Sequence, residues 1–144
     1  LVVGLMYEKT HTRYIPELGG LASRMPVIAT ILVIAGLASL GLPGLSGFIS
    51  EVLVLIGTFP VWPWPTAIAT FGIVLTTGYI LWLIQRVLFG PTLLRYEKVG
   101  DATVLEAVPL ALLAMAIVGV GVYPEFLTDV FSSTITPIVS LRFN

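Results

Sequence analysis

The sequence has no cysteine, one histidine and few charges among its 144 residues. Without cysteine the chain can form no disulfide, no thiolate metal site and no cysteine nucleophile. The single histidine, His11, cannot build a metal site by itself. Charged residues make up 10% of the chain, whereas soluble domains usually carry about a quarter. The net charge of −1 gives no indication of a nucleic-acid partner.

Apolar residues dominate instead. They make up 57% of the chain, and the mean hydropathy is +1.03. A soluble domain of this size could not bury so much apolar surface, so the lipid bilayer is the expected solvent. Between Met25 and Gln85 the only charged residue is Glu51. The composition therefore predicts an all-α integral membrane helical bundle, with residues 1–144 belonging to one transmembrane domain.

Three full transmembrane helices fit the apolar stretches, since a spanning helix needs roughly 20 residues. We expect them over 26–58, 66–88 and 104–123. The first two are separated by 59–65, where three prolines cannot sit inside a helix and two tryptophans suit the membrane interface. Residues 1–6 read as the end of a preceding helix, cut from a longer chain.

The two ends of the predicted bundle differ in charge. One end holds the loops before the first span and after the second, which contain Lys9, Arg13, Arg24, Arg86, Arg95 and Lys98. The loop 59–65 at the other end contains no lysine or arginine. By the positive-inside rule, the basic loops should be cytoplasmic and the C-terminus non-cytoplasmic. The tail 125–141 has apolar residues at helical spacing, which predicts an amphipathic helix on the membrane surface or on a neighbouring subunit. A frayed chain end is the alternative.

The first predicted span is much longer than a bilayer requires, and its middle contains Pro43, Gly44 and Gly47. Proline removes a backbone donor and glycine adds conformational freedom, so we expect two half-helices joined by an unwound segment. Broken helices recur at ion sites in membrane transporters. A simple proline kink without a transport role is the alternative.

Glu51 lies just after this predicted break, near the start of the second half-helix. Burying a carboxylate costs several kcal/mol unless it is paired, hydrated or protonated. A group that is neutral at one stage of a cycle and charged at another can accept and release protons. We therefore predict that Glu51 is on a proton path. The alternative is a structural glutamate paired with a lysine or arginine elsewhere in the fold.

Four other polar residues are candidates for the same path. Thr76, Thr77 and Tyr79 lie in the second span and could line a water chain. Membrane threonines more often hydrogen-bond to their own helix, which is the favoured alternative for both. His11 could collect protons from the cytoplasm, but an ordinary solvated loop histidine fits its position beside Lys9 and Arg13 better.

Several motifs together resemble the antiporter-like proton-channel subunits of respiratory complex I, in particular the M type, also called chain 4. They are Tyr7-Glu8-Lys9-Thr10-His11-Thr12-Arg13, Gly19-Gly20-Leu21, Met25-Pro26, Gly41-Leu42-Pro43-Gly44-Leu45-Ser46-Gly47-Phe48-Ile49-Ser50-Glu51, Phe89-Gly90 and Gly121-Val122-Tyr123-Pro124. The resemblance implies a subunit of 14 helices, of which this chain would hold the end of helix 11 and helices 12 to 14. Relatives of the L and N types usually carry lysine where this sequence has Glu51.

The resemblance also implies a function. The chain would belong to a translocase that passes protons from the cytoplasm through a hydrated axis to Glu51 and out. It would not be catalytic alone, because NADH, FMN, iron–sulfur clusters and quinone are expected in other subunits. The absence of a G-x-G-x-x-G dinucleotide motif agrees with this. The expected surroundings are the bacterial plasma membrane, the lipid bilayer and other membrane subunits, especially L-type and N-type neighbours.

Two other readings remain open. The chain could belong to a membrane-bound hydrogenase or to a multisubunit cation/proton antiporter, which would share the broken helix. It could also be a structural membrane spacer without a proton path.

Overall fold

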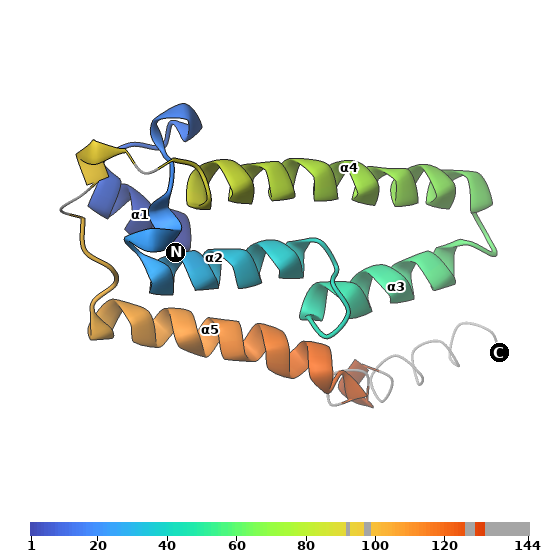
Figure 1. Ribbon diagram of the computed structural model, residues 1–144. Helices are drawn as coiled ribbons and strands as arrows, with labels where there is room; N and C mark the ends of the chain where they lie inside the picture. Colours follow the sequence, from blue (N-terminus) through green and yellow to red (C-terminus); the bar gives the residue numbers. More distant parts are fainter. Residues whose placement is uncertain (92, 97–98, 126–128, 132–144) are drawn as a thin grey trace.

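The chain is folded entirely into helices and loops within the part that the computed structural model describes, which excludes residues 92, 97–98, 126–128 and 132–144. The helices are α1 (Val2–Thr10), α2 (Pro26–Ser39), α3 (Ser46–Thr58), α4 (Pro63–Leu88) and α5 (Val104–Val122), with 3₁₀ turns at Ile15–Glu17, Leu21–Ser23 and Leu94–Tyr96. Helices α2 and α3 follow one another along the middle of the molecule, between α4 and α5 (Figure 1). Both α4 and α5 contact both of these shorter helices.

Helices α4 and α5 are long and apolar enough to cross a bilayer, while α2 and α3 are shorter apolar helices. Only 6% of the most apolar stretch of α4 and 11% of that of α5 are buried. The core helices of a soluble protein would be mostly covered, so these exposed apolar faces require lipid or other membrane helices around them. The predicted all-α integral membrane bundle is confirmed, with α2 and α3 forming one interrupted span.

The loop between α3 and α4 is shorter than the sequence predicted. Residues 59–65 were expected to lie outside any helix because of their prolines, but Pro63 and Pro65 lie in the first turn of α4. That expectation is wrong because the first helical N–H groups have no intrahelical acceptor, so proline loses nothing there. The hydroxyls of Thr58 and Thr66 lie 3.1 Å apart and join the two helix ends across this turn.

Helix α1 is longer than the expected helix end over residues 1–6. It continues through Tyr7, Glu8 and Lys9 to Thr10, and it ends at His11, which has the left-handed φ of 55°. The His11 N–H donates to the carbonyl of Tyr7 at 2.7 Å. The first part of the motif 7–13, which the sequence placed in a loop, is therefore helical. The expected amphipathic helix over 125–141 lies largely outside the described residues.

The basic loops meet at one end of the molecule, called the basic end below (Figure 1). The main cluster of buried apolar side chains lies there and includes Met6, Leu21, Met25, Ile28, Val87, Leu88 and Tyr96. Asp101, in the α4–α5 loop, caps α2 from a distance in sequence. Its carboxylate accepts the backbone N–H groups of Val27 at 2.7 Å and Ile28 at 3.3 Å, which are unsatisfied donors of that helix start.

Three further contacts fasten the basic end. Lys9 of α1 pairs with Glu106 of α5 at 3.3 Å, and Glu106 also closes a capping box with Thr103. The Tyr96 hydroxyl donates to the backbone carbonyl of Glu17 at 2.9 Å. Burial raises the pKa of the Tyr96 phenol; neighbouring Arg95 opposes this and Glu17 adds to it. Both basic loops and three helices are thus joined into one structure.

Candidate functional site: the helix break and Glu51

The break between α2 and α3 begins with a Schellman motif. Helix α2 ends at Ser39 with Leu40 as its C-cap, and Gly41 follows with the left-handed φ of 64°. The N–H of Gly41 donates to the carbonyl of Ala38, and the N–H of Leu42 donates to the carbonyl of Leu37, both at 3.3 Å. This pair of bonds defines the motif and requires a residue that tolerates positive φ, which is usually glycine. Gly41 therefore ends α2 before the chain reaches Pro43.

A tight turn then redirects the chain. Pro43 and Gly44 are its central residues, Gly44 has a φ of 91°, and the N–H of Leu45 donates to the carbonyl of Leu42 at 3.1 Å. Proline followed by a glycine with positive φ is the residue pattern of a type II turn. Leu45 then takes an extended conformation as the N-cap of α3. The helix break therefore lies at Pro43 and Gly44, as the sequence predicted.

Two glycines allow the broken segment to pack closely. A Cβ atom on Gly47 would overlap the carbonyl oxygen of Ala38, so the start of α3 lies directly against the end of α2. A Cβ atom on the buried Gly121 of α5 would overlap the backbone of Gly44 and Leu45. Helix α5 therefore supports the unwound backbone by direct contact.

Glu51 lies in the second turn of α3, and its half-buried carboxylate folds back over Gly41. A Cβ atom on Gly41 would overlap one carboxylate oxygen and lie 2.8 Å from the carboxyl carbon. The missing side chain of Gly41 thus provides the space that the carboxylate occupies. The acidic group is held at the junction of the two half-helices, next to the backbone that closes α2.

Within the described part of the chain, Glu51 has no salt bridge and no hydrogen-bond partner. A structural ion pair would therefore need a lysine or arginine outside the described residues. A carboxylic acid can donate a hydrogen bond when protonated, whereas the carboxylate can only accept. A protonated carboxyl at this position would therefore find different hydrogen-bond partners from an ionised one.

The other predicted path residues are dispersed. The hydroxyls of Thr76 and Thr77 donate to the carbonyls of Gly72 at 3.0 Å and Ile73 at 2.9 Å, as the favoured alternative predicted. Tyr79 is 60% exposed on α4, and His11 is exposed at the basic end. No described hydrogen bond connects any of these four residues with Glu51. A role for them in a water chain stays a prediction.

Sequence reasoning included Gly41 in the broken segment but missed its role in ending α2, and it missed Gly121 and Asp101 altogether. A glycine two residues before the Pro-Gly pair could have indicated a helix C-terminus. Gly121 has no local sequence signal beyond its place in the Gly121-Val122-Tyr123-Pro124 motif. Asp101 caps a helix that starts 75 positions earlier in the chain, so local patterns could not predict this contact. In the described ranges no group of three acidic or histidine side chains could hold a metal ion.

The chain matches known proteins over most of its length. A family described as NADH:quinone oxidoreductase/Mrp antiporter, transmembrane, matches residues 1–76, which is just over half of the chain. NADH-quinone oxidoreductase subunit M of Rhodobacter capsulatus is 40% identical over 96% of this chain and 27% of its own length. F420H2 dehydrogenase subunit M of Methanosarcina mazei is 39% identical over 96% of this chain and 28% of its own length.

A solved structure shows the same fold. A chain in respiratory complex I from Thermus thermophilus with bound NADH matches with a TM-score of 0.80 and 35% identity, covering 88% of this chain and 26% of that one. The resemblance to the antiporter-like subunits of complex I is therefore confirmed in sequence and in fold. The chain spans about a quarter of the length of the curated relatives that it matches.

Proposed function

Because the chain belongs to the NADH:quinone oxidoreductase/Mrp antiporter transmembrane family, we propose that it forms part of a proton-translocating membrane subunit of an NADH:quinone oxidoreductase. It supplies the end of helix 11 and helices 12 to 14 of a 14-helix subunit. Glu51 is the group that takes up and releases the proton in the exit part of the channel. The observation that carries this role is the carboxylate of Glu51 folded over Gly41 inside the helix break.

The break suits proton transfer for a physical reason. Unwound backbone at membrane depth is tolerated where it is buried in protein or lines a hydrated cavity, and proton transfer through Glu51 requires the second of these. Glu51 has no cationic partner within the described chain that would fix its charge. The protonated acid can donate to backbone carbonyls near the end of α2, and the carboxylate can accept from water. Proton occupancy thereby changes which partner the side chain binds.

The remaining path residues are proposed in supporting roles. His11 lies at the basic end, where protons enter if that end faces the cytoplasm. The back-bonded hydroxyls of Thr76 and Thr77 keep acceptor lone pairs that water can use, and Tyr79 offers a phenol on the same helix. Thr76, Thr77 and Tyr79 guide water rather than hold the proton, because none of them is a carboxylate, whereas His11 would collect protons at the entrance.

The rest of the machine is proposed to lie in other subunits. NADH, FMN, iron–sulfur clusters and quinone bind elsewhere, and the L-type and N-type subunits are the expected neighbours of this one. The chain is a translocase component and does not catalyse a redox step alone. We place it in the bacterial plasma membrane, with the basic end cytoplasmic and the C-terminus on the opposite side.

The test is a Glu51→Gln substitution in the full subunit within the intact, purified complex. Glutamine preserves the shape of the side chain and removes its titration. Proton uptake and quinone reduction are measured together in proteoliposomes, with Glu8→Gln as the control because Glu8 is an exposed carboxylate of α1 outside the break. We expect Glu51→Gln to lower the number of protons moved per electron pair and Glu8→Gln to leave it unchanged. Unchanged pumping in Glu51→Gln would favour a structural spacer.

A related machine is the second candidate. The matched family includes Mrp antiporters by its description, and the Methanosarcina relative is a subunit of an F420H2 dehydrogenase. The same membrane part can therefore be joined to different electron-input subunits, or to none. The soluble subunits that co-purify with the full protein distinguish these cases, since an NADH-oxidising module supports the first proposal.

A further inference from the structure

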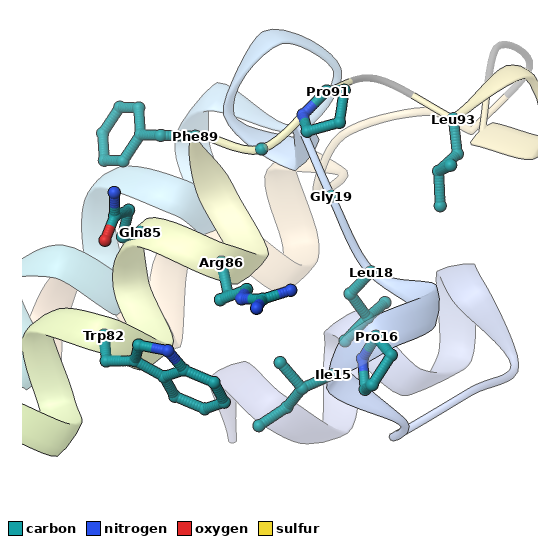
Figure 2. Close-up of a pocket in the computed structure, with 11 residues that line it drawn as sticks. Ile15, Pro16, Leu18, Gly19, Trp82, Gln85, Arg86, Phe89, Pro91 and Leu93 are labelled. Atoms are coloured by element: carbon teal, nitrogen blue, oxygen red, sulfur yellow. The ribbon is translucent and has the colours of Figure 1, made fainter.

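A cavity of about 500 Å³ lies at the basic end, between α4 and the two basic loops. Figure 2 shows the side chain of Arg86 extending from α4 into the space between Trp82, Ile15 and Leu18. The far wall is formed by Gly19 and Pro91, whose backbones are in contact: a Cβ on Gly19 would lie 2.8 Å from the Pro91 carbonyl oxygen. The cavity thus combines one cation with apolar and backbone walls.

The guanidinium of Arg86 is oriented and available. It lies over the Trp82 ring, 5.5 Å from the ring centroid, one helical turn away on the same face. A cation–π contact with a ring leaves guanidinium N–H groups that can donate to other acceptors. No described carboxylate pairs with Arg86, and no described acceptor bonds to it. Lys9 and Arg95 differ, because each has a carboxylate partner.

The tryptophans of α4 set the depth of this cavity in the membrane. Trp64 and Trp82 are both exposed, and 18 helical residues separate them by about 27 Å, close to the roughly 30 Å thickness of the hydrocarbon layer. Tryptophan belts mark the two interfaces of a bilayer. Arg86 lies about 6 Å further along the axis, which puts its guanidinium in the headgroup layer.

From this juxtaposition we propose that the cavity is a binding site for the headgroup of an anionic phospholipid, with Arg86 holding the phosphodiester. The planar fork of arginine binds two phosphate oxygens at once. Gln85, Arg86 and the exposed Phe89 all line the cavity, with the Phe89 ring pointing away from the Arg86 guanidinium (Figure 2). A polar headgroup and an apolar chain can therefore contact different parts of the rim. A lipid is favoured over free phosphate because the cavity lies at the level where lipid phosphates are concentrated.

The test uses the intact complex with its full membrane subunit. Wild type, Arg86→Gln and Arg24→Gln complexes are reconstituted in nanodiscs of phosphatidylcholine and phosphatidylglycerol in equal parts. They are then exchanged into phosphatidylcholine alone, and the retained phosphatidylglycerol is counted by mass spectrometry. Arg24 is the matched control because it is an exposed arginine of the basic end that does not line the cavity.

We expect Arg86→Gln to bind phosphatidylglycerol about tenfold or more weakly, since charge-assisted hydrogen bonds are lost, while Arg24→Gln equals wild type. Arg86→Lys keeps the charge without the fork and should retain an intermediate amount, which keeps the test usable if the glutamine variant does not assemble. Equal retention in Arg86→Gln and wild type overturns the proposal. So does displacement of the bound lipid by inorganic phosphate, or a map in which another protein segment fills the cavity.

Discussion

The contact between Gly41 and Glu51 yields the sharpest mutational prediction. A Gly41→Ala substitution adds one methyl group at a position with φ of 64°, directly where the Glu51 carboxylate lies. Two separate costs follow. An L-residue in the left-handed region costs about 1–2 kcal/mol, and overpacking a filled site costs about 1–3 kcal/mol. The expected total is about 2–5 kcal/mol, with the carboxylate forced off its position.

A double-mutant cycle separates these costs. In a Glu51→Ala background the three atoms nearest to the added methyl group are gone, so Gly41→Ala should cost mainly the backbone strain of about 1–2 kcal/mol. The non-additive remainder, about 1–3 kcal/mol, measures the contact itself. Gly44→Ala is the matched control, because Gly44 also has positive φ but has no atom within 4 Å of an added Cβ. Its effect should be the same with or without Glu51.

The assay is thermal inactivation of the assembled complex, recorded for the four members of the cycle and for the Gly44 pair. Non-additive midpoint shifts are expected for Gly41 with Glu51 and additive shifts for Gly44 with Glu51. If Gly41→Ala has the same effect in both backgrounds, the carboxylate does not lie over Gly41 in the working protein, and the described geometry of the break is refuted.

Three further outcomes are expected. Asp101→Ala should destabilise the complex by about 0.5–2 kcal/mol and speed hydrogen exchange at Val27, while Asp101→Asn should retain most of the cap because an amide oxygen also accepts. Thr76→Val and Thr77→Val should lower pumping less than Glu51→Gln does, since both hydroxyl protons are used within α4. Tyr96→Phe should cost about 0.5–1.5 kcal/mol, measured by thermal unfolding at neutral pH. Because the pKa of Tyr96 is raised, this contribution is complete below the unfolded pKa of about 10 and is lost as pH rises through the folded pKa.

The sequence predicted the fold well where the signal is local. The lengths of the apolar stretches predicted how many helices span the membrane, and the Pro43-Gly44 pair predicted the break between α2 and α3. The details of the break depended on backbone geometry that composition does not specify. Nothing in the sequence distinguishes the three glycines of this segment from one another. In the structure, Gly41 ends α2, Gly44 completes the turn, and Gly47 lets α3 pack closely against α2.

Contacts between distant segments were beyond local patterns. Asp101 caps α2, and Gly121 supports the break, only because the folded bundle places the α4–α5 loop beside the start of α2 and places α5 beside the break. The carboxylate of Glu51 could be predicted as functional from its lone charge in an apolar stretch. Its position over Gly41 could not be predicted, because it depends on how α3 starts after the turn.

The central claim is that Glu51 changes its protonation state during turnover. Infrared difference spectra of the intact complex, recorded before and after the electron donor is added, report protonated carboxylic acids directly. We predict a carboxylic acid band that is present in wild type and in Glu8→Gln but absent in Glu51→Gln. A difference spectrum of Glu51→Gln identical to wild type would contradict the claim, because Glu51 would then neither gain nor lose a proton.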